Sequence, residues 1–224
     1  MGRIVINDFK SKGTLTPAQH KSQFGNAEIS INANAADVVI KNSVFDQGGY
    51  NGIEIGLSAD VEPPKNVLIE GCDFSGEYTN NAILVFATQD NASINISNCH
   101  FKSVSNVLRI SNRTGAKNVS VFITDCVVDK WDSDPKYAGL IILEDYTSKN
   151  MDEFAEAGRF AKDKLSIHVK NLTYAGNKVA PEQVESLINC NNPNQLLYIY
   201  IDNVPSSYRY PEYDPEIFPE VEFK

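Results

Sequence analysis

Acidic side chains beside apolar, strand-like runs are the residues that could give this chain hydrolytic or lytic chemistry. Glu54, Glu144 and Asp145 lie in or next to such runs, and Arg109 lies in another. Glycoside hydrolysis needs two carboxyl groups at a defined separation. These acids do not form a paired motif, and the chain has no Gly-rich phosphate loop, HExxH or GxSxG. We therefore assign no catalytic residue.

The segment DKWDSDPKY (129–137) gathers three acids and the single tryptophan of the chain. Asp129, Asp132 and Asp134 are of the type that binds Ca²⁺, but the loop glycine and terminal Glu of an EF-hand are missing. A solvated turn is the favoured interpretation. Trp131 is a candidate anchor for an interface or for stacking on a sugar, and burial against the fold is the alternative.

The cysteines and histidines do not have the spacing of a metal site. Neither CxxC pairs nor zinc-type His spacings occur among them. The residues are Cys72, Cys99, Cys126, Cys190, His20, His100 and His168. We expect buried, reduced thiols made in a cytosol, with no metal and no cofactor.

The charge of the chain argues against two classes of partner. The net charge is −9 and the isoelectric point is about 4.8. An acidic surface repels phosphate backbones and anionic lipid surfaces. No apolar run approaches the roughly 20 residues of a membrane helix, and the N-terminus has no apolar signal region. We expect neither nucleic-acid nor membrane binding.

One pattern recurs along the chain and must position all of these side chains. It reads [V/I]-x-[I/V]-x-[N/D/G]-x-x-[aromatic/V]. Its second apolar position falls at Ile40, Ile69, Ile96, Ile123, Val169 and Ile201, with a degenerate copy at Ile6. Steps of 29, 27, 27, 46 and 32 residues separate the six copies. A period in this range predicts a repeat architecture.

Each copy predicts one coil of a parallel β-helix. Alternation within the motif indicates a strand with one buried face, and the Asn, Asp or Gly permits a left-handed turn before an inward aromatic. A second strand-like run completes each period, as in GIEIG (52–56) and VLRIS (107–111). Stacked coils would lie about 4.8 Å apart and bring Cys72, Cys99 and Cys126 into one column. An antiparallel β-sandwich is the alternative.

Over residues 28–205 the motif resembles the right-handed parallel β-helix superfamily of pectate lyases, polygalacturonases and many phage tailspikes. The resemblance implies an all-β, single-stranded right-handed parallel β-helix of about six to seven coils. Enzymes of that group use carboxylate clusters on one strand face. The corresponding outward positions here form a mixed polar stripe of Lys41, Glu70, Ser97, Thr124, Lys170 and Asp202.

Two segments interrupt or flank the repeat. Asn150 and Glu153 have capping-box spacing, so a short helix is expected over about 150–164, packed on one flank. A shorter helical turn is expected after Pro181. Residues 1–27 are expected to supply an N-terminal strand and a cap over the exposed end of the solenoid.

The last segment, 206–224, reads as an extended arm. Prolines recur at 211, 215 and 219, which forbids a helix or a central strand. Five aromatics alternate with acids: Tyr208, Tyr210, Tyr213, Phe218 and Phe223. We expect these side chains to bind, either over the chain's own solenoid or on a neighbouring subunit.

A rigid repeat with a terminal arm indicates a non-enzymatic structural protein. The resemblance is closest in character to bacteriophage virion β-helix proteins, so we expect a capsid decoration protein, head fibre or tail component, made in the host cytoplasm. Its partners would be other virion proteins, or further copies of itself. The alternatives are a polysaccharide lyase or glycosidase, and a non-catalytic glycan-binding module using Trp131.

Overall fold

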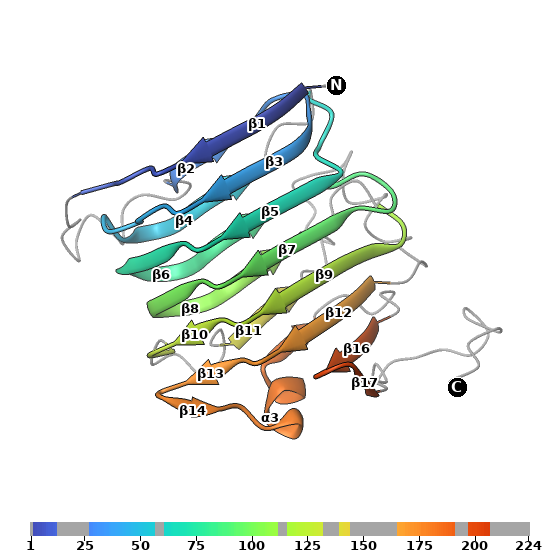
Figure 1. Cartoon of the computed structure of the whole chain (residues 1–224). Coiled ribbons are helices and arrows are strands. Elements are labelled where there is room, and N and C mark those ends of the chain that lie inside the picture. The colour runs from blue at the N-terminus through green and yellow to red at the C-terminus, as the bar shows by residue number, and fades with distance from the viewer. Residues whose placement is uncertain are drawn as a thin grey trace, which may run out of the picture.

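The fold is all-β, and nearly all of its strands are parallel. In a computed structural model, the described residues are 2–12, 27–56, 61–111, 116–131, 139–143, 165–190 and 197–206. Within them the strands form two sheets, and the one helix is α3 (Pro181–Ser186) (Figure 1). The helical turn predicted after Pro181 is therefore confirmed. The helix expected over 150–164 lies outside the described residues.

The first sheet carries the repeated motif. Its order is β1-β3-β5-β7-β9-β12-β16-β17, parallel until the final antiparallel pair. The strands are β1 (Gly2–Asn7), β3 (Ala35–Lys41), β5 (Asn66–Glu70), β7 (Ser93–Ser97), β9 (Val119–Thr124), β12 (Leu165–Lys170), β16 (Leu197–Ile201) and β17 (Val204–Ser206). The second apolar residue of each motif copy pairs in register with that of the next copy, from Ile6 and Ile40 down to Ile201.

The second sheet is built from the remaining strand of each period. Its main path, β14-β13-β10-β8-β6-β4-β2, is parallel except for the β13–β14 hairpin, and β11 and β15 join beside β8. Its strands are β2 (Ala27–Ile31), β4 (Gly49–Ile55), β6 (Asp73–Val85), β8 (His100–Ile110), β10 (Val127–Val128), β11 (Gly139–Leu143), β13 (Thr173–Tyr174), β14 (Asn177–Lys178) and β15 (Ile188–Cys190). Parallel pairing of all the strands except the β13–β14 and β16–β17 pairs excludes the antiparallel sandwich.

A left-handed residue turns the chain between the sheets at each repeat. The turn positions of the first five motif copies have φ between 49° and 62°, and Asn203 of the sixth copy has φ of 67°. The five are Asn42, Gly71, Asn98, Asp125 and Asn171. Asn, Asp and Gly adopt this conformation at low cost, whereas most L-residues do not. The predicted turns are confirmed.

Identical motif positions lie above one another in the core. Phe74 is stacked between Phe45 and Phe101, with ring centroids 4.7 and 4.9 Å apart. The three cysteines also share a column: the backbone N of His100 donates to the carbonyl of Cys72, and that of Val127 donates to Cys99. Hydrogen bonding with Cys126 raises the pKa of Cys99 to about 12, which keeps this buried thiol protonated.

A buried asparagine column lies within the second sheet. Asn51, Asn81 and Asn106 are paired in register and at most 1% exposed. The Asn81 backbone N and its Nδ2 both donate to Asn51 Oδ1, at 3.2 and 3.0 Å. These bonds satisfy the donors of Asn81 next to a shift in the register between β6 and β8, whereas Asn81 Oδ1 and Asn106 Oδ1 are buried without a hydrogen-bond partner among the described residues.

The two ends of the sheets differ. β1 and β2 form the N-terminal edges, and β1 is the first copy of the motif because it pairs in register with β3. At the other end, the antiparallel pairs β13–β14 and β16–β17 reverse the chain, with α3 between them (Figure 1). The cap expected before residue 27 falls largely on residues outside the described ones.

Candidate functional site

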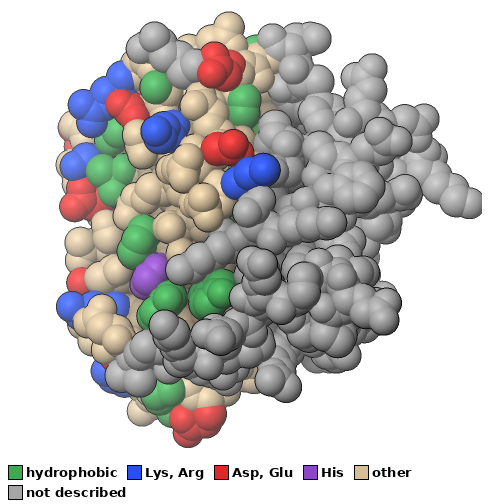
Figure 2. All heavy atoms as spheres, turned by 90° about the vertical axis from the view of Figure 1, so that its right-hand side faces the viewer, with side chains coloured by type: hydrophobic (Ala, Val, Ile, Leu, Met, Phe, Trp, Pro, Cys, Tyr) green, Lys and Arg blue, Asp and Glu red, His purple; other side chains and the backbone are tan. Residues whose placement is uncertain are grey.

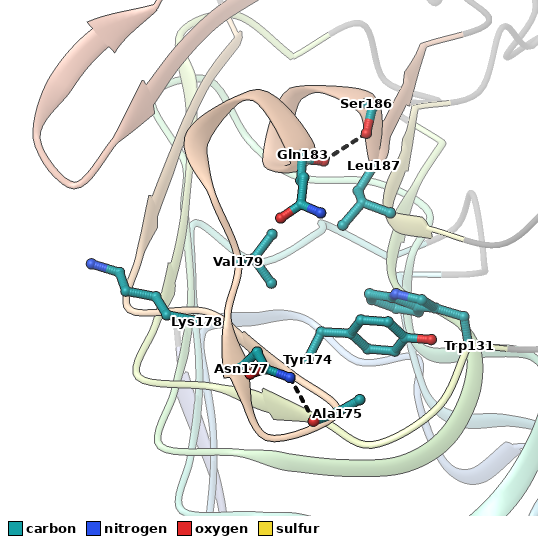
Figure 3. Close-up of a pocket in the computed structure, with 9 residues that line it drawn as sticks. All are labelled: Trp131, Tyr174, Ala175, Asn177, Lys178, Val179, Gln183, Ser186 and Leu187. Atoms are coloured by element: carbon teal, nitrogen blue, oxygen red, sulfur yellow. Dashed lines mark hydrogen bonds between the residues drawn. The ribbon is translucent and has the colours of Figure 1, made fainter.

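A pocket of 390 Å³ lies at the C-terminal end of the sheets, beside α3 (Figure 3). Its walls come from the segment after β10, from the β13–β14 hairpin and from α3. The lining residues are Trp131, Tyr174, Ala175, Asn177, Lys178, Val179, Gln183, Ser186 and Leu187. Its size is within the range of about 300–1,000 Å³ that is usual for ligand sites.

Stacked aromatic rings form one wall of this pocket. The rings of Trp131 and Tyr174 lie 5.7 Å apart at an angle of 25°. Trp131 is held by a parallel bridge to Val104, and Tyr174 is held by its pairing with Val128. Trp131 is half-buried and Tyr174 is 38% exposed. Part of this aromatic surface therefore faces solvent.

The hairpin and α3 form the opposite wall. Ala175 and Gly176, both at positive φ, form the two-residue loop that joins the paired Tyr174 and Asn177. Gln183 Oε1 accepts a 3.0 Å hydrogen bond from the backbone N of Ala180, which caps the start of α3. This bond holds Gln183 beside the pocket, next to Val179 and Leu187 (Figure 3).

An ion pair between Lys178 and Asp202 lies at the rim of the pocket. Lys178 Nζ lies 2.7 Å from Asp202 Oδ2, in the turn between β16 and β17. The hydrogen bond from Lys178 lowers the pKa of Asp202. The pocket is therefore apolar and aromatic inside, with amide groups and one paired cation at its edge. This composition suits binding, since none of the lining residues in the described part of the chain is a carboxylic acid, histidine or cysteine.

The carboxylate candidates that the structure describes do not converge into a second site. Glu54 and Arg109 lie on one face of the second sheet, two strands apart, with Leu84 between them in register. Glu54 is only 2% exposed, and its Oε1 accepts a 2.8 Å hydrogen bond from Asn51. Desolvation raises the pKa of Glu54. Glu144 and Asp145 lie outside the described residues.

The polar stripe of the first sheet is a solvated face. Its members follow one another in register from Lys41 to Lys170, and Lys41 pairs with Glu70 at 2.6 Å. In the side view of Figure 2, the described part of the surface carries Lys and Arg side chains among Asp and Glu side chains. Asp129 pairs with His100 at 2.7 Å, whereas Asp132 and Asp134 lie outside the described residues.

Two negative findings concern the described part of the chain alone. No three His, Cys, Asp or Glu side chains there converge on a position that would hold a metal ion. None of its helices has the length and apolar character needed to cross a bilayer.

The sequence indicates Trp131, one half of the pocket, but not the exposure of the other half. The motif predicts a buried aromatic at Tyr174. Tyr174 does pair in register with the buried Val128, but it is 38% exposed, because the next strand on its other side is the antiparallel β14 and not another parallel repeat. The two-residue Ala-Gly loop between Tyr174 and Asn177 is the feature of the sequence that predicts this hairpin. The arm residues Tyr208, Tyr210, Tyr213, Phe218 and Phe223 lie outside the described residues.

Comparison of the chain with protein-family models, curated proteins and solved structures gave no match. The case for a function therefore depends on the geometry and on the sequence.

Proposed function

We propose that the two sheets are walls of a right-handed parallel β-helix of about six to seven coils, and that the chain is a non-enzymatic structural protein of a bacteriophage virion. It would serve as a capsid decoration protein, head fibre or tail component, docked through its termini. The observation that carries the proposal is the continuous register of one motif copy per strand, from Ile6 to Ile201.

General rules of topology support the handedness. The chain leaves β3, passes through the second sheet as β4, and returns to the first sheet as β5, parallel to β3 and beside it. Crossover connections between neighbouring parallel strands are right-handed in nearly all proteins, because strands twist to the right. Repeating this connection gives a right-handed coil with a rigid, ladder-packed interior.

The arrangement of acids supports a role without catalysis. Glu54, the acid buried on the second sheet, is 2% exposed and would have to be uncovered to reach a substrate. The acids of the first sheet alternate with Lys, Ser and Thr, so they do not make a carboxylate pair across neighbouring strands.

Proteomics of purified virus particles from the source organism tests the virion role. We expect the chain in the particle fraction at a constant ratio to the major capsid protein. A variant lacking 207–224 should fold but be absent from particles. Recovery of the wild-type chain only in the soluble fraction would rule out a virion role.

A glycan-binding module is the second candidate, because the exposed Tyr174 ring and the Trp131 ring offer apolar faces of the kind that sugars stack on. Glycan-array binding that is lost in Trp131→Ala would favour it. A lyase or glycosidase would instead degrade acidic or capsular polysaccharide, with activity lost in Glu54→Gln or Glu144→Gln.

A further inference from the structure

We propose that the aromatic pocket receives the C-terminal arm, residues 207–224, of a second copy of this chain. The inference rests on the proposed docking through the termini and names the site and the segment that would carry it. It joins two features that the structure and the sequence give separately: an open pocket with a Trp–Tyr wall, and an aromatic, proline-rich segment.

The chemistry of the wall matches the chemistry of the arm. Grooves lined by Trp and Tyr recognise proline-rich extended segments, because a backbone already held extended by proline loses little entropy on binding. The arm has prolines at 211, 215 and 219, each within three residues of a tyrosine or phenylalanine. The 390 Å³ of open space beside Trp131 and Tyr174 suits a proline with a neighbouring aromatic ring.

Charge also favours this occupant. Residues 207–224 contain five acids and two basic residues. Lys178 lies at the rim of the pocket and Lys130 directly precedes Trp131, and both are exposed. Lys178 is already paired with Asp202, so Lys130 is the cation that an acidic segment bound over Trp131 would approach, and salt would weaken that attraction.

Length and starting point make the contact feasible between copies. The arm begins after β17, and β17 follows the turn that holds Asp202, the ion-pair partner of the pocket residue Lys178. Eighteen extended residues at about 3.1 Å each would reach some 56 Å. None of the described residues fills the pocket, which leaves room in it for the arm of a neighbour.

The single tryptophan makes the inference directly measurable in the full-length chain. Emission of Trp131 and molar mass by light scattering are recorded over the same concentration series. We expect the emission to shift to the blue, and acrylamide quenching to fall at least twofold, as the mass rises above that of one chain. Added salt should shift both curves to higher concentration.

Variants on both sides of the contact complete the test. Tyr174→Ser in the pocket and a Tyr208/Tyr210/Tyr213→Ser triple variant in the arm should each abolish the change in Trp131 emission and the rise in molar mass. Val5→Ser is the matched control, because Val5 is 57% exposed at the opposite end of the sheets, and it should leave them intact. A synthetic peptide of residues 206–224, added to the triple variant, should restore the blue shift without raising the mass to that of two chains.

Other outcomes overturn the inference. A shift that is lost in the arm variant but is independent of concentration would mean that the pocket holds its own arm. Emission unaffected by arm variants and peptide, but changed by titration with oligosaccharides, would assign the pocket to a glycan. Either result leaves the presence of the chain in virus particles, and so the proposed function, to be decided separately.

Discussion

Individual core residues matter in this protein because each one touches its equivalents on both sides. Phe74 is fully buried between Phe45 and Phe101, and its ring packs over Gly52, where an added Cβ would lie 3.0 Å from it. A ring removed from the middle of such a column leaves a cavity that neither neighbour can fill without moving its own strand.

Phe74→Ala should therefore lower the free energy of unfolding by about 3–5 kcal/mol, the usual cost of truncating a buried ring. Urea denaturation followed by circular dichroism measures it. Leu68→Ala is the control, since Leu68 lies on the outward side of β5 and is only half-buried. We expect it to cost under about 1 kcal/mol. Equal losses would argue against the aromatic column.

Burial of Glu54 predicts an unusual pH dependence. Desolvation raises the pKa of Glu54 in the folded state above its value in the unfolded chain, so the folded state binds the proton more tightly. Stability from this group is then full at low pH and is lost as the pH rises through the folded pKa. Glu28, whose pKa is also raised by burial, acts with the same sign.

Glu54→Gln should consequently be more stable than the wild type at pH 7, with a difference that shrinks as the pH falls through the raised pKa of the folded state and is lost near the unfolded value of about 4.5. Thermal denaturation between pH 4 and pH 7 tests this expectation, and Gln retains an oxygen that can accept the hydrogen bond from Asn51. A variant that is less stable at pH 7, or a difference independent of pH, would show that the carboxylate is stabilised where it lies.

At the scale of elements, the turns decide where each strand begins. Asn98 has φ of 52°, and its backbone N donates to the carbonyl of Thr124 in the next repeat at 3.0 Å. Asn98→Ala should destabilise the fold by about 1 kcal/mol, because alanine is strained at positive φ. Asn98→Gly should cost less than alanine, because glycine adopts this conformation freely. A larger cost for glycine would mean that the Asn side chain, rather than the backbone angle, matters here.

The sequence predicts the elements whose conformation depends on neighbouring residues alone. Period-2 alternation predicts the strands of the first sheet, and the Asn, Asp or Gly after each strand predicts the left-handed turn. The length of strands β6 and β8 is not predicted by the motif, since their register shifts next to the buried Asn81 depend on pairing across repeats. The exposure of Tyr174 is not predicted either, because Tyr174 keeps the register of the motif but is followed by a hairpin and not by another parallel repeat.

The candidate site was harder to predict than the fold. Trp131 stands out by composition, but its partners come from β13, β14 and α3, up to 56 residues further along the chain. Their meeting depends on how the last repeats close the end of the sheets. No repeat pattern specifies that closure, because terminal repeats depart from the consensus.

The whole molecule is held together by neighbour-to-neighbour contacts along one axis. In such a structure, stability is approximately the sum of terms within repeats and between adjacent ones. Among the described residues the two ends of the sheets differ: the parallel strands β1 and β2 lie at one end, and hairpins with α3 and the aromatic pocket lie at the other. Ends that differ in this way suit the proposed docking in a defined direction.

The central claim is that equivalent residues are stacked one strand spacing apart, and pulsed electron–electron spin resonance between paired spin labels tests it most directly. Asn7, Lys41, Thr124 and Lys170 share one outward column of the first sheet. The Asn7–Thr124 and Lys41–Lys170 pairs each span four spacings, so both should give about 19 Å between backbones. The Asn7–Lys170 pair spans five and should be about 5 Å longer. Unequal distances for the two four-spacing pairs, or no increase for the third, would contradict the stacked architecture.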